Sequence, residues 1–106
     1  MALKNWAIAS TAATTDEDLV VCGAGQACAL VSISICNKNA AASTTTLIVT
    51  DASNVELASI INAVSIDASD TFFIDTKIFL ESTEKLRIYT SLATTSIIAS
   101  GDESAA

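Results

Sequence analysis

The sequence predicts an all-β protein, an antiparallel two-sheet β-sandwich of seven to eight short strands. One segment alternates apolar and polar residues with a period of two, short runs of β-branched residues recur along the chain, and turns rich in Asn, Asp, Ser and Gly separate them. Hydrophobic residues make up 51% of the chain and aromatic residues 5%, so the core is expected to be aliphatic. The pattern leaves the jelly-roll and immunoglobulin-like strand orders both open.

The clearest predicted strand covers residues 27–37. Its alternation places Ala29, Val31, Ile33 and Ile35 on one face, and Ser32, Ser34 and Cys36 on the other. The other predicted strands are 4–10, 18–22, 43–51, 71–75, 77–81, 84–90 and 95–100. Leu47 and Val49, Phe72 and Ile74, Ile78 and Leu80, and Leu86 and Ile88 are the expected inward pairs of four of these strands.

Residues 54–64 fit either a helix or a strand. Leu57, Ile60, Ile61 and Val64 recur at helical spacing, and the run from Ser53 to Glu56 fits a capping box. The Ile pair and the run 64–66 are equally acceptable in a strand, so both interpretations stay open.

The 106 residues predict a single domain, 1–106, because no linker, charge block or long-period repeat divides the chain. The last segment, 100–106, is small and polar, and we expect it to be frayed unless a neighbour orders it. No secretory signal follows the N-terminal residues, which favours synthesis in the cytosol.

Three cysteines, Cys22, Cys28 and Cys36, are expected to be small buried hydrophobic residues. Cys22 and Cys28 flank a plausible hairpin turn and could become cross-strand neighbours, so whether any of the three forms a disulfide stays open. Their spacing and the lack of His argue against a zinc site.

The sequence supplies no recognisable catalytic equipment. The absence of His removes the commonest general base and excludes Ser-His-Asp and Cys-His arrangements. The acidic groups at 16–18, 67–75 and 102–103 have no calcium-binding register and are expected at turns and strand ends. The Gly23-Ala24-Gly25 run lacks the rest of a phosphate-binding loop, and a turn explains it better. We therefore predict no enzyme and no catalytic, cofactor-binding or metal site.

Trp6 and Tyr89 are the candidate residues for a sugar-stacking pair, but packing onto the sandwich or onto a neighbouring subunit fits their surroundings better.

The charge pattern disfavours nucleic acids and membranes as partners. The net charge is −7, and no basic stripe can track a phosphate backbone. The five basic residues are scattered at Lys4, Lys38, Lys77, Lys85 and Arg87. No apolar run is long enough to span a bilayer. Because only 16% of residues are charged, much of the surface is weakly solvated, and we expect a partner protein to cover part of it.

Several segments resemble the small β-sandwich virion proteins of tailed bacteriophages. These segments are the strand end 33–37, the Ser/Thr-rich strand ending at Asp51, the Phe72-Phe73-Ile74 strand, Leu80 leading into 86–88, and the closing run 97–103. The resemblance implies a capsid decoration (cement) protein located in the virion, with the major capsid protein or other virion proteins as partners. A tail, neck or fibre component, including a module that binds a host surface or a glycan, is the alternative it implies. A symmetric homo-oligomer, most simply a trimer, would bury the excess apolar surface.

Overall fold

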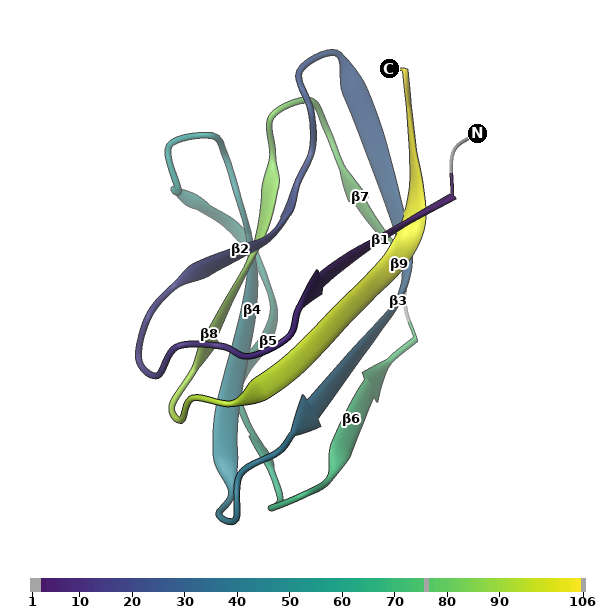
Figure 1. Cartoon of the computed structure of the whole chain (residues 1–106). Coiled ribbons are helices and arrows are strands. Elements are labelled where there is room, and N and C mark those ends of the chain that lie inside the picture. The colour runs from purple at the N-terminus through teal and green to yellow at the C-terminus, as the bar shows by residue number, and fades with distance from the viewer. Residues whose placement is uncertain (1–2, 76, 106) are drawn as a thin grey trace.

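The computed structural model describes residues 3–75 and 77–105, and these residues form two antiparallel sheets without a helix (Figure 1). The strands are β1 (Leu3–Ile8), β2 (Glu17–Val21), β3 (Gln26–Asn37), β4 (Ser43–Thr50), β5 (Glu56–Ile66), β6 (Thr71–Ile74), β7 (Ile78–Leu80), β8 (Lys85–Thr90) and β9 (Thr95–Ala105). The predicted all-β sandwich is confirmed. Within the described ranges no helix is long and apolar enough for a membrane span.

The strand order is that of a jelly roll. The first sheet runs β1-β9-β3, with β6 and β7 both paired to β3, and the second runs β2-β8-β4-β5. β6 pairs with the second half of β3 and β7 with its first half, so the two short segments together fill one strand position. With β6 and β7 counted as one strand, the chain passes from sheet to sheet at each connection except the β4–β5 hairpin. The structure thus separates the two strand orders that the sequence left open.

Aliphatic side chains from both inner faces form the core, as predicted from the composition. The predicted inward residues Leu47, Val49, Leu86 and Ile88 are buried, and Ile97 joins them from β9. Phe72 and Ile74 are only partly buried and pack against the margin of this core.

The predicted face of β3 is correct for only half of the strand. Ile33 and Ile35 are buried, but Val31 is 48% exposed and Leu30 is fully buried in its place. The pairing with β9 shifts register between Leu30 and Ser32, which is a β-bulge that reverses the alternation on its N-terminal side. The face predicted for Ala29 and Val31 is therefore wrong, because the extra residue of a bulge moves the side chains before it to the opposite face.

Residues 56–66, the segment that fitted either a helix or a strand, form strand β5 at an edge of the second sheet. This strand brings the total among the described residues to nine, one more than the upper prediction. Its pairing with β4 is irregular at three places. The adjacent residues Ile60 and Ile61 both pack against the core, whereas Leu57 is 52% exposed. The run that suggested a capping box lies in the turn before β5 and ends at Glu56, the first residue of that strand. In the turn, Asp51 Oδ1 accepts hydrogen bonds from the backbone N–H groups of Ser53 and Val55.

The predicted fraying of the C-terminal segment is wrong for residues 100–105, which continue strand β9. Residues up to Asp102 pair with β1, and residues up to Ala105 pair with β3. Ladder hydrogen bonds on both sides order this segment although its side chains are small and polar. Ala106, the last residue of the predicted tail, lies outside the described residues.

Candidate interaction surface

The outer side of the first sheet carries an unusually apolar set of side chains. Cross-strand pairing arranges them in three rows: Leu3, Asp102, Ala29 and Phe79; Asn5, Ser100 and Ser32; and Ala7, Ile98, Ser34 and Phe73. We call these eleven residues, together with Val31 at the bulge, the apolar outer face. Asp102 is a charged member of this set, and Lys4, Asp75 and Lys77 lie at its margins.

Phe73 and Phe79 are the most prominent residues of this face, each with 72% of its surface exposed. Their exposure follows from the pleat, because the residues on either side of each phenylalanine point toward the core. Ile78 and Leu80 are buried on either side of Phe79, and Phe72 and Ile74 pack inward around Phe73. The two rings therefore stand outward on neighbouring segments at one edge of the sheet.

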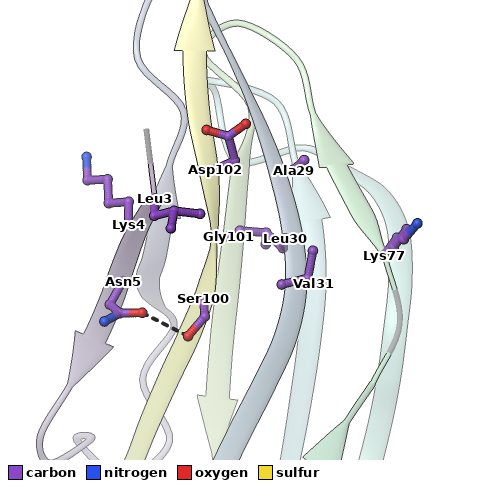
Figure 2. Close-up of a pocket in the computed structure, with 10 residues that line it drawn as sticks. All are labelled: Leu3, Lys4, Asn5, Ala29, Leu30, Val31, Lys77, Ser100, Gly101 and Asp102. Carbon is purple, nitrogen blue, oxygen red and sulfur yellow. Dashed lines mark hydrogen bonds between the residues drawn. The ribbon is translucent and has the colours of Figure 1, made fainter. Parts of the chain in front are cut away.

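Two adjoining hollows cross the same face. The first lies over Gly101, with Leu3 on one side and Val31 and Lys77 on the other (Figure 2). The second lies beside Phe73 and Ile98, and Ser100 lines both hollows. The Ser100 hydroxyl donates a 2.8 Å hydrogen bond to Asn5 Oδ1. The surface is thus shaped as well as apolar, a combination that suits contact with another protein.

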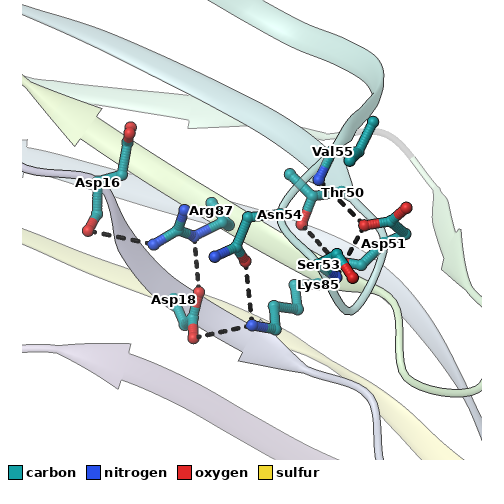
Figure 3. Close-up of polar contacts among 9 residues, drawn as sticks. All are labelled: Asp16, Asp18, Thr50, Asp51, Ser53, Asn54, Val55, Lys85 and Arg87. Carbon is teal, nitrogen blue, oxygen red and sulfur yellow. Dashed lines mark hydrogen bonds and ion pairs between the residues drawn. The ribbon is translucent and has the colours of Figure 1, made fainter.

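The outer side of the second sheet has the opposite character. Asp18 accepts a 2.7 Å hydrogen bond from Arg87 Nε, and its other oxygen lies 3.6 Å from Lys85 Nζ (Figure 3). The Lys85 ammonium also donates to Asn54 Oδ1 at 3.0 Å, and Arg87 donates to the backbone oxygen of Asp16. Such exposed pairs add little stability, but they keep this side polar and hydrated. The two sides therefore differ, and the first sheet presents the candidate interaction surface.

The structure places Trp6 and Tyr89 on different sheets. Trp6 lies on β1, is partly buried and packs against the core, with Lys4 Nζ 5.3 Å from the centre of its ring. Tyr89 lies on β8 and is 36% exposed on the outer side of the second sheet. The two rings do not form a common sugar-stacking platform.

The cysteine predictions hold for two of the three residues. Cys22 and Cys28 are buried, and their sulfur atoms and a Glu103 oxygen all lie within 4.8 Å of one another. Cys36 is only partly buried. The expected hairpin between Cys22 and Cys28 is wrong, because β2 and β3 belong to opposite sheets and residues 23–26 form a turn that crosses between them.

Glu103 is held from two sides. Lys4 Nζ donates to Oε1 at 2.8 Å, and the backbone N–H of Gly23 donates to Oε2 at 3.3 Å. Two hydrogen bonds hold the pKa of the Glu103 carboxyl below its usual range, the one from Lys4 having the larger effect and the one from Gly23 the smaller. Burial above all, and then the neighbouring Cys22 and Glu103, raise the pKa of the Cys28 thiol.

Most of the acidic residues singled out in the sequence lie at turns and strand ends, as expected, but the prediction is wrong for Asp102 and Glu103, which lie within β9 and pair with β3. Glu17 Oε1 accepts a 2.6 Å hydrogen bond from the Ala12 N–H, and Asp70 Oδ1 accepts one from the Thr71 N–H at 2.8 Å. Within residues 3–75 and 77–105, the group of side chains that could hold a metal ion consists of Cys22, Cys28 and Glu103. None of the other acidic residues in these ranges belongs to this group.

Comparison with known proteins finds similarity among solved structures. No protein-family model matches the chain, and no curated protein matches it. Four chains of solved structures match, among them a chain described as belonging to the structure of the infectious bursal disease virus Gx strain. The TM-score is 0.49 and the sequence identity 10%, over 96% of this chain and 31% of the other. The chain thus spans about a third of that protein's length.

Proposed function

We propose that this chain is a structural subunit of a virion that binds its neighbours through the apolar outer face. The observation that carries the proposal is the exposure of five large apolar side chains on one face, those of Leu3, Val31, Phe73, Phe79 and Ile98. Soluble proteins rarely leave such a patch uncovered, and aromatic residues are enriched where one protein binds another.

If each assembly holds many copies of this chain, modest contacts at each copy are sufficient for stable binding. A symmetric assembly offers many copies of one site, and simultaneous engagement raises avidity by about 10²–10⁴ without any new type of contact. We propose a homo-oligomer, most simply a trimer, seated on a symmetric lattice. Surface that is rich in Ser and Ala would pack closely in such a contact at little desolvation cost.

The finer proposal is a decoration protein of a bacteriophage head, bound to the major capsid protein after synthesis in the host cytoplasm. Its support is the sequence resemblance of the strand end 33–37, the Phe72-Phe73-Ile74 strand and the closing run 97–103 to small virion proteins of tailed phages. A neck, tail or fibre component would use the same face. The glycan-binding alternative has no support from Trp6 and Tyr89, which lie apart.

The test is binding of the purified protein to phage heads that lack it, measured by co-sedimentation and followed by heating of the decorated heads. The double variant Phe73→Ser/Phe79→Ser should stay folded, because both rings are exposed, and should bind at least about 10-fold more weakly. The matched control is Val55→Ser/Leu57→Ser, which removes two side chains that are 58% and 52% exposed, one just before β5 and one on β5 in the other sheet. We expect the control to bind as the parent does.

Equal binding by both double variants would refute the role of the apolar outer face. Failure of the parent protein to bind or to raise the rupture temperature of the heads would refute the decoration role. Light scattering of the protein alone tests the trimer separately, because a stable monomer at micromolar concentration contradicts it.

A further inference from the structure

Two buried thiols and a carboxylate meet at one end of the sandwich, where β2 leaves the second sheet and β3 and β9 pair in the first. Cys22 follows β2, while Cys28 and Glu103 are cross-strand partners on β3 and β9. Their ligand atoms lie within 4.8 Å of one another, and Cys28 Sγ is 3.6 Å from Glu103 Oε2. We propose that Cys22, Cys28 and Glu103 form a binding site for Zn²⁺.

The distances are close to those of a tetrahedral zinc site. Zn–S bonds of about 2.3 Å and Zn–O bonds of about 2.0 Å place ligand atoms about 3.5 Å apart for sulfur and oxygen, and about 3.8 Å for two sulfurs. The Cys28–Glu103 separation of 3.6 Å already matches the first value. Small side-chain rotations would bring Cys22 into place.

The carboxylate is already oriented for a ligand. Oε1 is bound by Lys4, so Oε2 faces the thiols and is supported there by the Gly23 N–H. Hydrogen bonds of this kind fix a ligating carboxylate and are a regular part of metal sites. Lys4 is therefore a positioning residue for Glu103.

The charges of such a site would cancel. Zn²⁺ binding replaces the two thiol protons, which leave to solvent, and gives two thiolates. The thiolates and the Glu103 carboxylate then balance the metal and the Lys4 ammonium.

The donor set also selects the metal. Two thiolates favour Zn²⁺ over Mg²⁺ and Ca²⁺, which require oxygen ligands. The carbonyl oxygens of Gln26 and Leu80 lie 3.5 and 3.7 Å from Cys22 Sγ, where the Cys22 thiol donates to them. One of these carbonyls or a water molecule would complete the four-coordinate shell.

The test uses the full chain, freed of metal by a chelator and kept reduced, titrated with Co²⁺ as a spectroscopic probe. We expect one Co²⁺ per chain, thiolate-to-cobalt charge-transfer absorbance, and displacement by Zn²⁺. Glu103→Gln should weaken binding at least about 10-fold, and Cys28→Ser at least about 100-fold. Cys36→Ser is the matched control, because this thiol lies at the other end of β3, and it should bind as the parent does.

Thermal unfolding gives a second readout. At about 100 times the dissociation constant, Zn²⁺ should raise the Tm of the parent by about 10 °C and leave that of Cys28→Ser unchanged. Glu103→Gln keeps both buried thiols and tests the site even if Cys28→Ser fails to fold. No charge-transfer absorbance in the parent, or equal Co²⁺ affinity of Glu103→Gln and the parent, would overturn the proposal.

Discussion

At the scale of single residues, two neighbouring threonines show how local partners decide the value of a buried hydroxyl. Thr45 and Thr90 are cross-strand partners on β4 and β8, and both are buried. Thr90 Oγ1 lies 2.9 Å from Thr11 Oγ1 and shares a hydrogen bond with it. Among the described residues Thr45 Oγ1 has no hydrogen-bond partner. The two hydroxyls therefore contribute to stability with opposite signs.

Replacing each threonine by valine should separate these effects. Thr45→Val should raise the free energy of unfolding by about 1 kcal/mol, because it removes a buried hydroxyl that lacks a partner. Thr90→Val should lower it by about 1 kcal/mol, because Thr11 then loses its bonded neighbour. Urea unfolding of the two variants measures both values. Changes of the same sign would contradict the hydrogen-bond assignment.

Gly101 is required because β9 approaches β3 closely at the bulge. A Cβ at this position would overlap the carbonyl oxygen of Ala29 and lie 2.9 Å from the Cα of Leu30. Gly25 is needed for a different reason. A Cβ there would have no atom within 4 Å, but the backbone φ of +74° is one that disfavours residues with a side chain.

Alanine at the two glycine positions should therefore have unequal costs. Gly101→Ala should destabilise the protein by about 3 kcal/mol, because the backbone of β3 must move. Gly25→Ala should cost about 1 kcal/mol, from the unfavourable φ alone. Guanidinium unfolding compares the two, and an equal cost would refute the close approach of β9 to β3.

At the scale of elements, Asn37 joins the end of β3 to the connections around it. Its side chain is fully buried, and Nδ2 donates to the backbone oxygens of Ala41, Ile66 and Asp67 at 3.0, 3.0 and 3.2 Å. Oδ1 accepts a 3.0 Å hydrogen bond from the Asn39 N–H. One side chain thus ties the β3–β4 connection to the end of β5.

Asn37→Ala should lower the free energy of unfolding by about 3 kcal/mol, because it leaves buried carbonyl groups without donors. The control is Asn62→Ala on β5, where the side chain is exposed and the change should stay within about 0.5 kcal/mol. Thermal unfolding of both variants checks this. A Tm for Asn37→Ala close to that of the control would show that the network does not stabilise these connections.

The sequence predicts strands well where pairing is regular and poorly where it is not. The alternation around Ile33 and Ile35 fixes their inward direction, because a regular strand places every second residue on one face. The bulge before Ser32 is set by β9, which lies far along the chain, so no local pattern reveals it. The ordered end of β9 depends likewise on partners that are distant in sequence.

At the scale of the whole molecule, the composition predicts a partner-covered surface but not its location. The outward direction of Phe73 and Phe79 follows from the inward prediction for their neighbours. That both rings lie on the same face as Ile98 and Leu3 follows only from the jelly-roll order, which local patterns do not specify. The place of Glu103 beside the two cysteines escapes sequence reasoning for the same reason, since 75 residues separate it from Cys28.

The place of β9 between β1 and β3 sets the order in which this protein can be made. β9 is the last of the nine strands to leave the ribosome, yet both of its neighbours need it to complete their hydrogen bonds (Figure 1). Until then, the first sheet is split, and the inner apolar side of β3 is open to other nascent chains. The first sheet can therefore close only once β9 has been synthesised, and the interval before that is the stage at which aggregation threatens the protein most.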